Sequence, residues 1–289
     1  MIAPHFLKHR ALRFFLYLIL TGLAGWFLLK SVDFSHAEIV WQAITHPIIL
    51  FLGIVGFICD ALLWRRAFLK QQSISPTRSI IACGLTLWFK YIPGKIWSLI
   101  GRPQLLKSPV SVKDITILSL KYQLAFFAPI PLFCLPLLWV IPVSWNILTA
   151  CAGLVVLCIA LKFMPLVAKQ IMQLSLLDLL ISGIMWSAWG GGFTLMALII
   201  GGDATEISWQ LFITYPVSIA GAIAALFAPG GIGVREYGVH FLLSHDPAFL
   251  GKMATLLLTS RIWFLLSEAL FFCMAVILYT MSQQRMLKE

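Results

Sequence analysis

The chain has 289 residues, of which 61% are hydrophobic, and its mean hydropathy is +0.95. Only 11% of the residues are charged, against roughly 25% in soluble domains. The formal net charge is +10, but the basic residues stand in short loops between apolar runs, which argues against a nucleic-acid-binding surface. The composition therefore predicts an all-α polytopic membrane protein, with one transmembrane domain over residues 1–289.

The first half of the chain predicts three full spans. Basic residues precede the apolar run over residues 14–29, which we interpret as an uncleaved first span with a cytoplasmic N-terminus. A loop over residues 30–46 leads to a second span over residues 47–64, which returns the chain to the cytoplasm. After a broken segment, residues 115–140 are predicted to cross outward.

The broken segment of the first half covers residues 80–100. Its centre reads Lys90-Tyr91-Ile92-Pro93-Gly94-Lys95, and basic loops stand on both of its sides. Two basic loops on opposite faces of the membrane would violate the positive-inside rule. The sequence therefore predicts a re-entrant hairpin that opens to the cytoplasm and turns near Pro93 and Gly94.

The second half repeats this order of segments. Its predicted elements are spans over residues 146–161, 176–200 and 253–279, and a second broken segment over residues 209–243. An acidic loop over residues 201–206 precedes that segment, and a cytoplasmic C-terminus requires the segment to open to the outer side. The total is six full spans and two hairpins, arranged as a possible inverted repeat of residues 1–141 and 142–289.

The second break contains the strongest candidate site. A proline and closely spaced glycines interrupt an apolar segment, which requires partners in protein or in a water-filled cavity for the freed backbone. A helix that restarts near Val234 would present free N–H groups and a positive dipole end to an anion. If the two hairpin tips meet, the candidate lipid-phosphate site comprises Lys90, Pro93, Gly94, Lys95, Pro229, Gly230, Gly231, Gly233, Arg235 and Glu236.

Two further ionisable residues lie deep in the last span. Arg261 and Glu268 are seven residues apart on one helix and so share a face. Glu268 is either part of an ion pair with Arg261, Arg235 or a lysine, or a proton-coupling carboxylate. Glu236 has the same two interpretations, since it could also stabilise a helix N-terminus. The sequence predicts no catalytic residue, metal site or cofactor.

Other polar residues in apolar segments have ordinary explanations. Arg102 and Lys121 are expected to extend to the lipid headgroups, and Asp60 and Asp178 to have a solvated or interfacial role near cytoplasmic span ends. The three consecutive glycines at positions 190–192 are expected to allow close helix packing rather than to bind a ligand.

Two stretches resemble a known family. The string Pro229-Gly230-Gly231-Ile232-Gly233-Val234-Arg235-Glu236 looks like the signature of the flippase-like transmembrane domain of the lysylphosphatidylglycerol synthase family. The stretch Tyr91-Ile92-Pro93-Gly94-Lys95-Ile96-Trp97 is similar to that family's first broken segment. The resemblance implies a protein of a prokaryotic cytoplasmic membrane that moves a lipid between leaflets. Family members with a soluble aminoacyl-transferase domain carry it after the membrane part, so we expect no aminoacyl transfer from this chain, which ends at Glu289.

The expected function is a flippase that binds the phosphate of a phospholipid or of a polyprenyl-phosphate-linked lipid. The expected partners are the membrane and that lipid, with a possible homo-oligomer or membrane enzyme and no nucleic acid. Two alternatives remain open: an accessory subunit of a lipid- or glycan-modifying enzyme, and an integral-membrane enzyme acting on a lipid-linked phosphate. The sequence leaves open the lipid, the direction and energy source of transport, and the oligomeric state.

Overall fold

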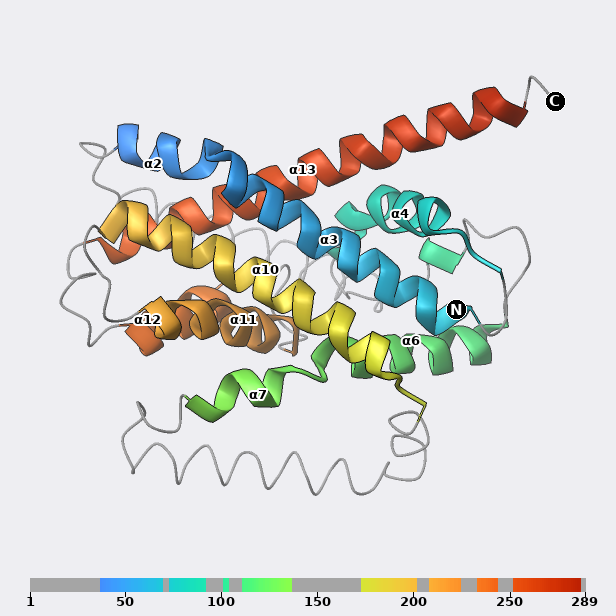
Figure 1. Ribbon diagram of the computed structural model, residues 1–289, viewed down its shortest axis with the longest axis horizontal. Helices are drawn as coiled ribbons and strands as arrows, with labels where there is room; N and C mark the ends of the chain where they lie inside the picture. The colour runs from blue at the N-terminus through green and yellow to red at the C-terminus, as the bar shows by residue number, and fades with distance from the viewer. Residues whose placement is uncertain are drawn as a thin grey trace, which may run out of the picture.

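Figure 1 shows the computed structural model, which describes residues 37–69, 73–91, 101–103, 111–136, 173–201, 208–224, 233–243 and 252–286. In this part of the chain all regular elements are helical and no strand is present. The elements are α2 (Ala37–Thr45), α3 (Pro47–Phe68), α4 (Pro76–Leu85), the 3₁₀ helix η2 (Leu87–Tyr91), α6 (Val112–Phe127), α7 (Ile130–Cys134), α10 (Leu176–Gly201), α11 (Ser208–Ala224), α12 (Val234–Leu243) and α13 (Met253–Met286).

Four helical stretches among the described residues are long and apolar enough to cross a membrane. They cover Pro47–Phe68, Lys113–Cys134, Leu176–Gly201 and Met253–Gln284. Each coincides with a predicted span, so the all-helical prediction and these four apolar helices are confirmed. The spans predicted over residues 14–29 and 146–161 lie outside the described residues.

Local sequence explains where several helices begin. The side chain of Ser75 accepts a hydrogen bond from the backbone N–H of Arg78 at 3.2 Å, and Pro76 follows as the first residue of α4. At the start of α6, Ser111 accepts from the N–H of Asp114 at 3.1 Å. Serine at the N-cap satisfies a free helix donor, and proline at the first helical position loses no intrahelical bond.

One predicted loop is wrong. Residues 37–45, which we expected to belong to a loop over residues 30–46, form α2. This short helix is amphipathic: Ala43 and Ile44 are buried against the bundle, whereas Trp41 is 66% exposed. Packing of its apolar face against α10 and α13 stabilises a helix that is too short to be stable alone.

Helices α3 and α10 form the centre of the bundle and run antiparallel (Figure 1). Arg66, in the last turn of α3, donates to the carboxylate of Asp178 and, at 2.7 Å, to the hydroxyl of Ser175 at the start of α10. At the other end, Lys252 donates to the carbonyl of Gly201 at 3.3 Å and so joins the start of α13 to the end of α10. The three helices therefore alternate in direction in the order α3, α10, α13.

The glycines of α10 allow the close packing that was predicted for them. A Cβ atom at Gly190 would lie 2.4 Å from the carbonyl oxygen of Phe212 on α11, and one at Gly192 would lie 2.5 Å from the ring of Trp263 on α13. Real Cβ atoms do not approach other atoms this closely, so α11 and α13 reach these positions only because α10 carries glycine there.

We expect Gly190→Ala to lower the free energy of unfolding by about 1–3 kcal/mol, because a methyl group would push α11 away from α10. Gly183→Ala on the same helix is the matched control, since a Cβ there meets no atom within 4 Å. The control should be neutral or more stable by about 0.5–1 kcal/mol, from helix propensity alone. Unfolding by sodium dodecyl sulfate in bicelles measures both. Equal effects of the two variants would contradict the close contact.

Buried tryptophans tie the helices together through their indole N–H groups. Trp186 donates to the carbonyl of Phe126 at 2.6 Å and thereby links α10 to α6. Trp263 donates to the carbonyl of Ile49 at 2.9 Å and links α13 to α3. An indole in an apolar interior needs such an acceptor, so these bonds fix how the helices are rotated against each other.

Candidate functional site

The second break separates two helices that pack against each other, α11 and α12. Pro229, Gly230 and Gly231 fall in residues 225–232, which lie outside the described residues. Gly233, directly before α12, has φ = +84°, a conformation that residues with a Cβ rarely adopt. The glycine at this position is therefore needed to direct the chain into α12.

The N-terminus of α12 binds an anion from the chain itself. The backbone N–H of Gly233 donates to Oε2 of Glu236 at 2.8 Å. A glutamate three residues into a helix that accepts from the N-cap N–H is the second half of a capping box, and its charge matches the positive end of the helix dipole. Of the two roles that the sequence left open for Glu236, the structure shows this helix-capping contact.

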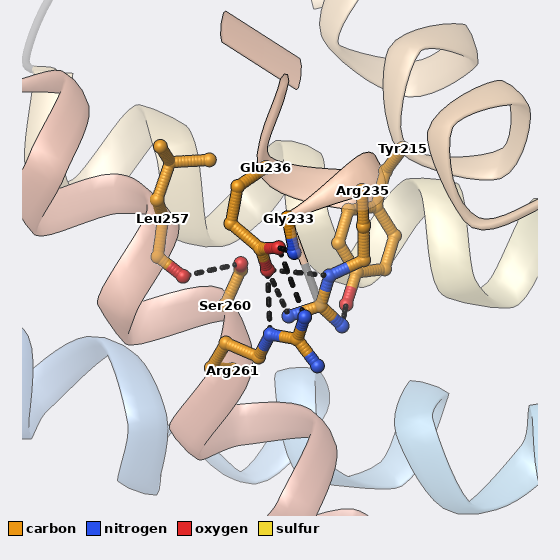
Figure 2. Close-up of polar contacts among 7 residues, drawn as sticks. All are labelled: Tyr215, Gly233, Arg235, Glu236, Leu257, Ser260 and Arg261. Carbon is orange, nitrogen blue, oxygen red and sulfur yellow. Dashed lines mark hydrogen bonds and ion pairs between the residues drawn. The ribbon is translucent and has the colours of Figure 1, made fainter. Parts of the chain in front are cut away.

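Arg261 of α13 holds the same carboxylate with two hydrogen bonds (Figure 2). Its Nε donates to Oε1 of Glu236 at 2.5 Å, and its Nη2 donates to Oε2 at 2.9 Å. Arg235 approaches Oε1 from the other side, with Nε at 3.3 Å. The side chains of Arg235 and Glu236 are only 6% and 12% exposed, so two arginines share one largely buried carboxylate.

Arg235 lies among aromatic rings and keeps unused donor capacity. Its Nη1 donates to the hydroxyl of Tyr215 at 3.3 Å. The guanidinium carbon lies 5.6 Å from the ring centroid of Tyr215 and 5.8 Å from that of Phe264, within the range of cation–π attraction. Nη2 lies 3.3 Å from Glu236 without hydrogen-bond geometry and is a buried nitrogen with no hydrogen-bond partner in the described structure.

Glu268 is fully buried in α13, two turns after Arg261. It interacts electrostatically with Tyr215, which places it close to the cluster around Arg235. Figure 2 shows Arg261 bound to Glu236, which comes from another helix. The ion pair and the proton coupling that the sequence offers for Glu268 both stay predictions.

Four polar residues are more buried than the sequence predicted. Arg102 and Lys121 were expected to reach the headgroups, and Asp60 and Asp178 to have a solvated or interfacial role, yet each is at most 7% exposed. Asp178 is held by Arg66, as described above. For Asp60, Arg102 and Asp178 the physical reason is that charged partners on other segments pair with them, and pairing across such sequence distances leaves no local signal.

A second buried cluster forms where the residues after the first break meet α3 and α6. Arg102 Nη2 lies 3.3 Å from Oδ2 of Asp60, and the hydroxyl of Tyr122 donates to the other carboxylate oxygen. The guanidinium of Arg102 also lies 5.4 Å from the ring centroid of Tyr122. The position of Asp60, two turns inside an apolar helix that ends in two arginines, was the one available hint that it needs a partner.

Of the residues predicted around the first break, Pro93, Gly94 and Lys95 lie outside the described residues, as does the side chain of Lys90. The chain on the two sides of this break lies close together, since a Cβ at Gly101 would be 2.9 Å from the ring of Phe89. The structure therefore brings Arg235, Glu236 and Arg261 together and leaves the meeting of the two hairpin tips a prediction.

Comparison of the chain with protein-family models, curated proteins and solved structures finds no match. Within the described ranges, no group of three histidine, cysteine, aspartate or glutamate side chains is arranged to hold a metal ion. The arrangement around Arg235 thus consists of two guanidinium groups, the Glu236 carboxylate that they share at the start of α12, and aromatic rings. Chemically, such groups can bind an oxyanion.

Proposed function

We propose that this chain is a multi-pass protein of a prokaryotic cytoplasmic membrane that binds the phosphate of an anionic lipid and moves that lipid between leaflets. In this proposal six spans and two re-entrant hairpins form the transmembrane domain, and both termini are cytoplasmic. The resemblance of the two broken segments to the flippase-like domain of the lysylphosphatidylglycerol synthase family supports the class of substrate. The observation that carries the proposal is the buried guanidinium of Arg235 with a spare donor nitrogen.

The unpaired donor of Arg235 matters because leaving a hydrogen-bond donor unpaired in an apolar interior costs free energy. A buried guanidinium nitrogen without a hydrogen-bond acceptor loses the hydrogen bonds that it would make with water. A lipid phosphate offers charged oxygens to such a donor, and hydrogen bonds between two charged groups are the stronger kind. Binding of a phosphate by Arg235 therefore has a driving force that a fully paired arginine would lack.

Glu236 makes this binding reversible. Its carboxylate occupies the helix N-terminus and lies against Arg235 and Arg261, so an incoming phosphate must share these donors with it or displace it. Because Arg261 forms the two shorter bonds, Glu236 remains neutralised when Arg235 turns to a lipid. A site that exchanges one anion for another can release its ligand, as transport requires.

The test is leaflet translocation of fluorescent phosphatidylglycerol, its lysyl ester and a polyprenyl phosphate in proteoliposomes. We expect wild-type protein to move at least one of them and Arg235→Gln to move it about tenfold to a hundredfold more slowly, since a hydrogen bond to a charged group contributes roughly 1.5–3 kcal/mol. Arg235→Gln should fold, because the Glu236–Arg261 pair is left intact. Lys113→Gln, which removes an exposed cation, is the matched control and should transport normally.

Three results would contradict the proposal. Equal translocation rates for wild type and Arg235→Gln would show that Arg235 takes no part in transport. No movement of any of the three lipids by folded wild-type protein would favour an accessory subunit of a lipid- or glycan-modifying enzyme. Chemical conversion of a labelled lipid in detergent, where no two-sided membrane exists, would indicate an enzyme.

A further inference from the structure

The second buried cluster repeats the chemistry of the first. Each contains an arginine that follows a Pro-Gly break in the sequence, and each arginine lies over a tyrosine ring, at 5.4 Å for Arg102 with Tyr122 and 5.6 Å for Arg235 with Tyr215. Each arginine also contacts one carboxylate, that of Glu236 in the first cluster and that of Asp60 in the second. The two clusters come from different helices and share no residue.

Arg102 has more unused donors than Arg235. Its residue is 7% exposed, and its Nε and Nη1 are buried atoms without a hydrogen-bond partner in the part of the chain that the structure describes. These two nitrogens carry three of the five N–H donors of a guanidinium. The single contact of Nη2 with Asp60, at 3.3 Å, leaves most of the guanidinium unmatched.

Asp60 is poorly placed to supply the missing acceptors. One of its oxygens accepts from the hydroxyl of Tyr122, and the other already accepts from Arg102 Nη2. A phosphate group has the right chemistry, since its oxygens accept several parallel hydrogen bonds from one guanidinium. Arg102 therefore points to an oxyanion that does not belong to the described chain.

Aromatic rings lie between the two clusters. The ring of Phe264 lies beside the guanidinium of Arg235 and packs on Phe57 with 5.2 Å between ring centroids. Phe57 precedes Asp60 by about one helical turn on α3. A ligand at Arg102 and one at Arg235 would thus be held on two sides of an apolar layer.

We propose that Arg102 forms a second phosphate-binding site, which holds the headgroup of a lipid of the same class as the Arg235 site. This inference rests on the proposed function, because it assigns a second position to the same ligand. Two sites on two sides of an aromatic layer provide a start and an end position for one headgroup. The phosphate oxyanion is the shared chemistry, and it can come from a lipid or from free inorganic phosphate.

Native mass spectrometry of the purified protein with phosphatidylglycerol tests both sites together. We expect wild type to retain two lipid molecules, Arg102→Gln and Arg235→Gln to retain one each, and the double variant to retain none. The dissociation constant of the lost binding step should rise at least tenfold. Diacylglycerol, which lacks the phosphate, and the exposed-site variant Lys113→Gln are the controls.

A second variant separates a binding site from a purely structural ion pair. Asp60→Asn/Arg102→Gln removes both charges and leaves two amides that can bond with each other, so the fold should be retained. We expect this variant to unfold at the wild-type temperature and still to bind only one lipid. Retention of two lipids by this variant or by Arg102→Gln would overturn the second site. Retention of two lipids by Arg235→Gln alone would instead overturn the proposed function.

Excess inorganic phosphate identifies the source of the oxyanion. A lipid held also by its hydrocarbon tails should stay bound, because free phosphate competes only for the guanidinium. Displacement of the Arg102-dependent lipid by phosphate would assign the site to a small anion.

Discussion

Replacing Glu236 with alanine is expected to lower the free energy of unfolding by about 3–5 kcal/mol, the usual cost of removing one partner of a buried ion pair. The carboxylate accepts from Gly233, Arg235 and Arg261, and its side chain is only 12% exposed. Alanine would leave two arginines close together without the carboxylate that they share and would remove the cap of α12. Titration with sodium dodecyl sulfate in bicelles measures the change.

Two variants show whether charge causes the loss. Glu38→Ala removes an exposed carboxylate from α2 and should change the stability by less than about 0.5 kcal/mol. Glu236→Ala/Arg261→Met replaces the bidentate pair with apolar groups and should recover much of the stability, because it removes both charges of that pair. A Glu236→Ala variant as stable as wild type would show that the Glu236–Arg261 pair is not buried in the folded protein.

Trp263→Ala is expected to lower the free energy of unfolding by about 3 kcal/mol, near the lower end for replacing a large core residue by alanine. We expect the lower end because lipid is as apolar as the tryptophan side chain. The loss of stability then comes from the cavity and the lost contacts, and not from transfer of the side chain out of water. Trp263 is fully buried and donates to Ile49. Its ring packs on Tyr215 with 5.6 Å between centroids.

The same substitution should weaken phosphate binding, because Tyr215 supports the guanidinium of Arg235. Trp263→Phe keeps most of the volume and loses the hydrogen bond, so it should cost about 1 kcal/mol. Trp41→Ala, at a residue that is 66% exposed, is the matched control and should change stability by less than about 0.5 kcal/mol. A Trp263→Ala variant that matched this control would contradict the central position of the indole.

The sequence by itself determined the helical class and four of the apolar helices, because twenty or more consecutive apolar residues favour one structure in a membrane. It also predicted that a helix restarts near Val234, since glycine and proline act on the local backbone. Gly190 and Gly192 were correctly expected to allow close packing, because an added Cβ atom there would collide with a neighbouring helix. Residues 37–45 were misread because a loop and a short amphipathic helix differ only in what covers them.

Only the tertiary structure decided which charges meet. Arg261 binds Glu236, 25 residues away, and Arg102 lies against Asp60, 42 residues away. No local pattern favoured these partners, because the cost of a buried charge depends on which helices face each other and at what depth. For that reason Asp60 and Arg102 looked like solvated or interfacial residues near span ends, and the packing of α3 and α6 with the residues that follow the first break makes them a buried cluster instead.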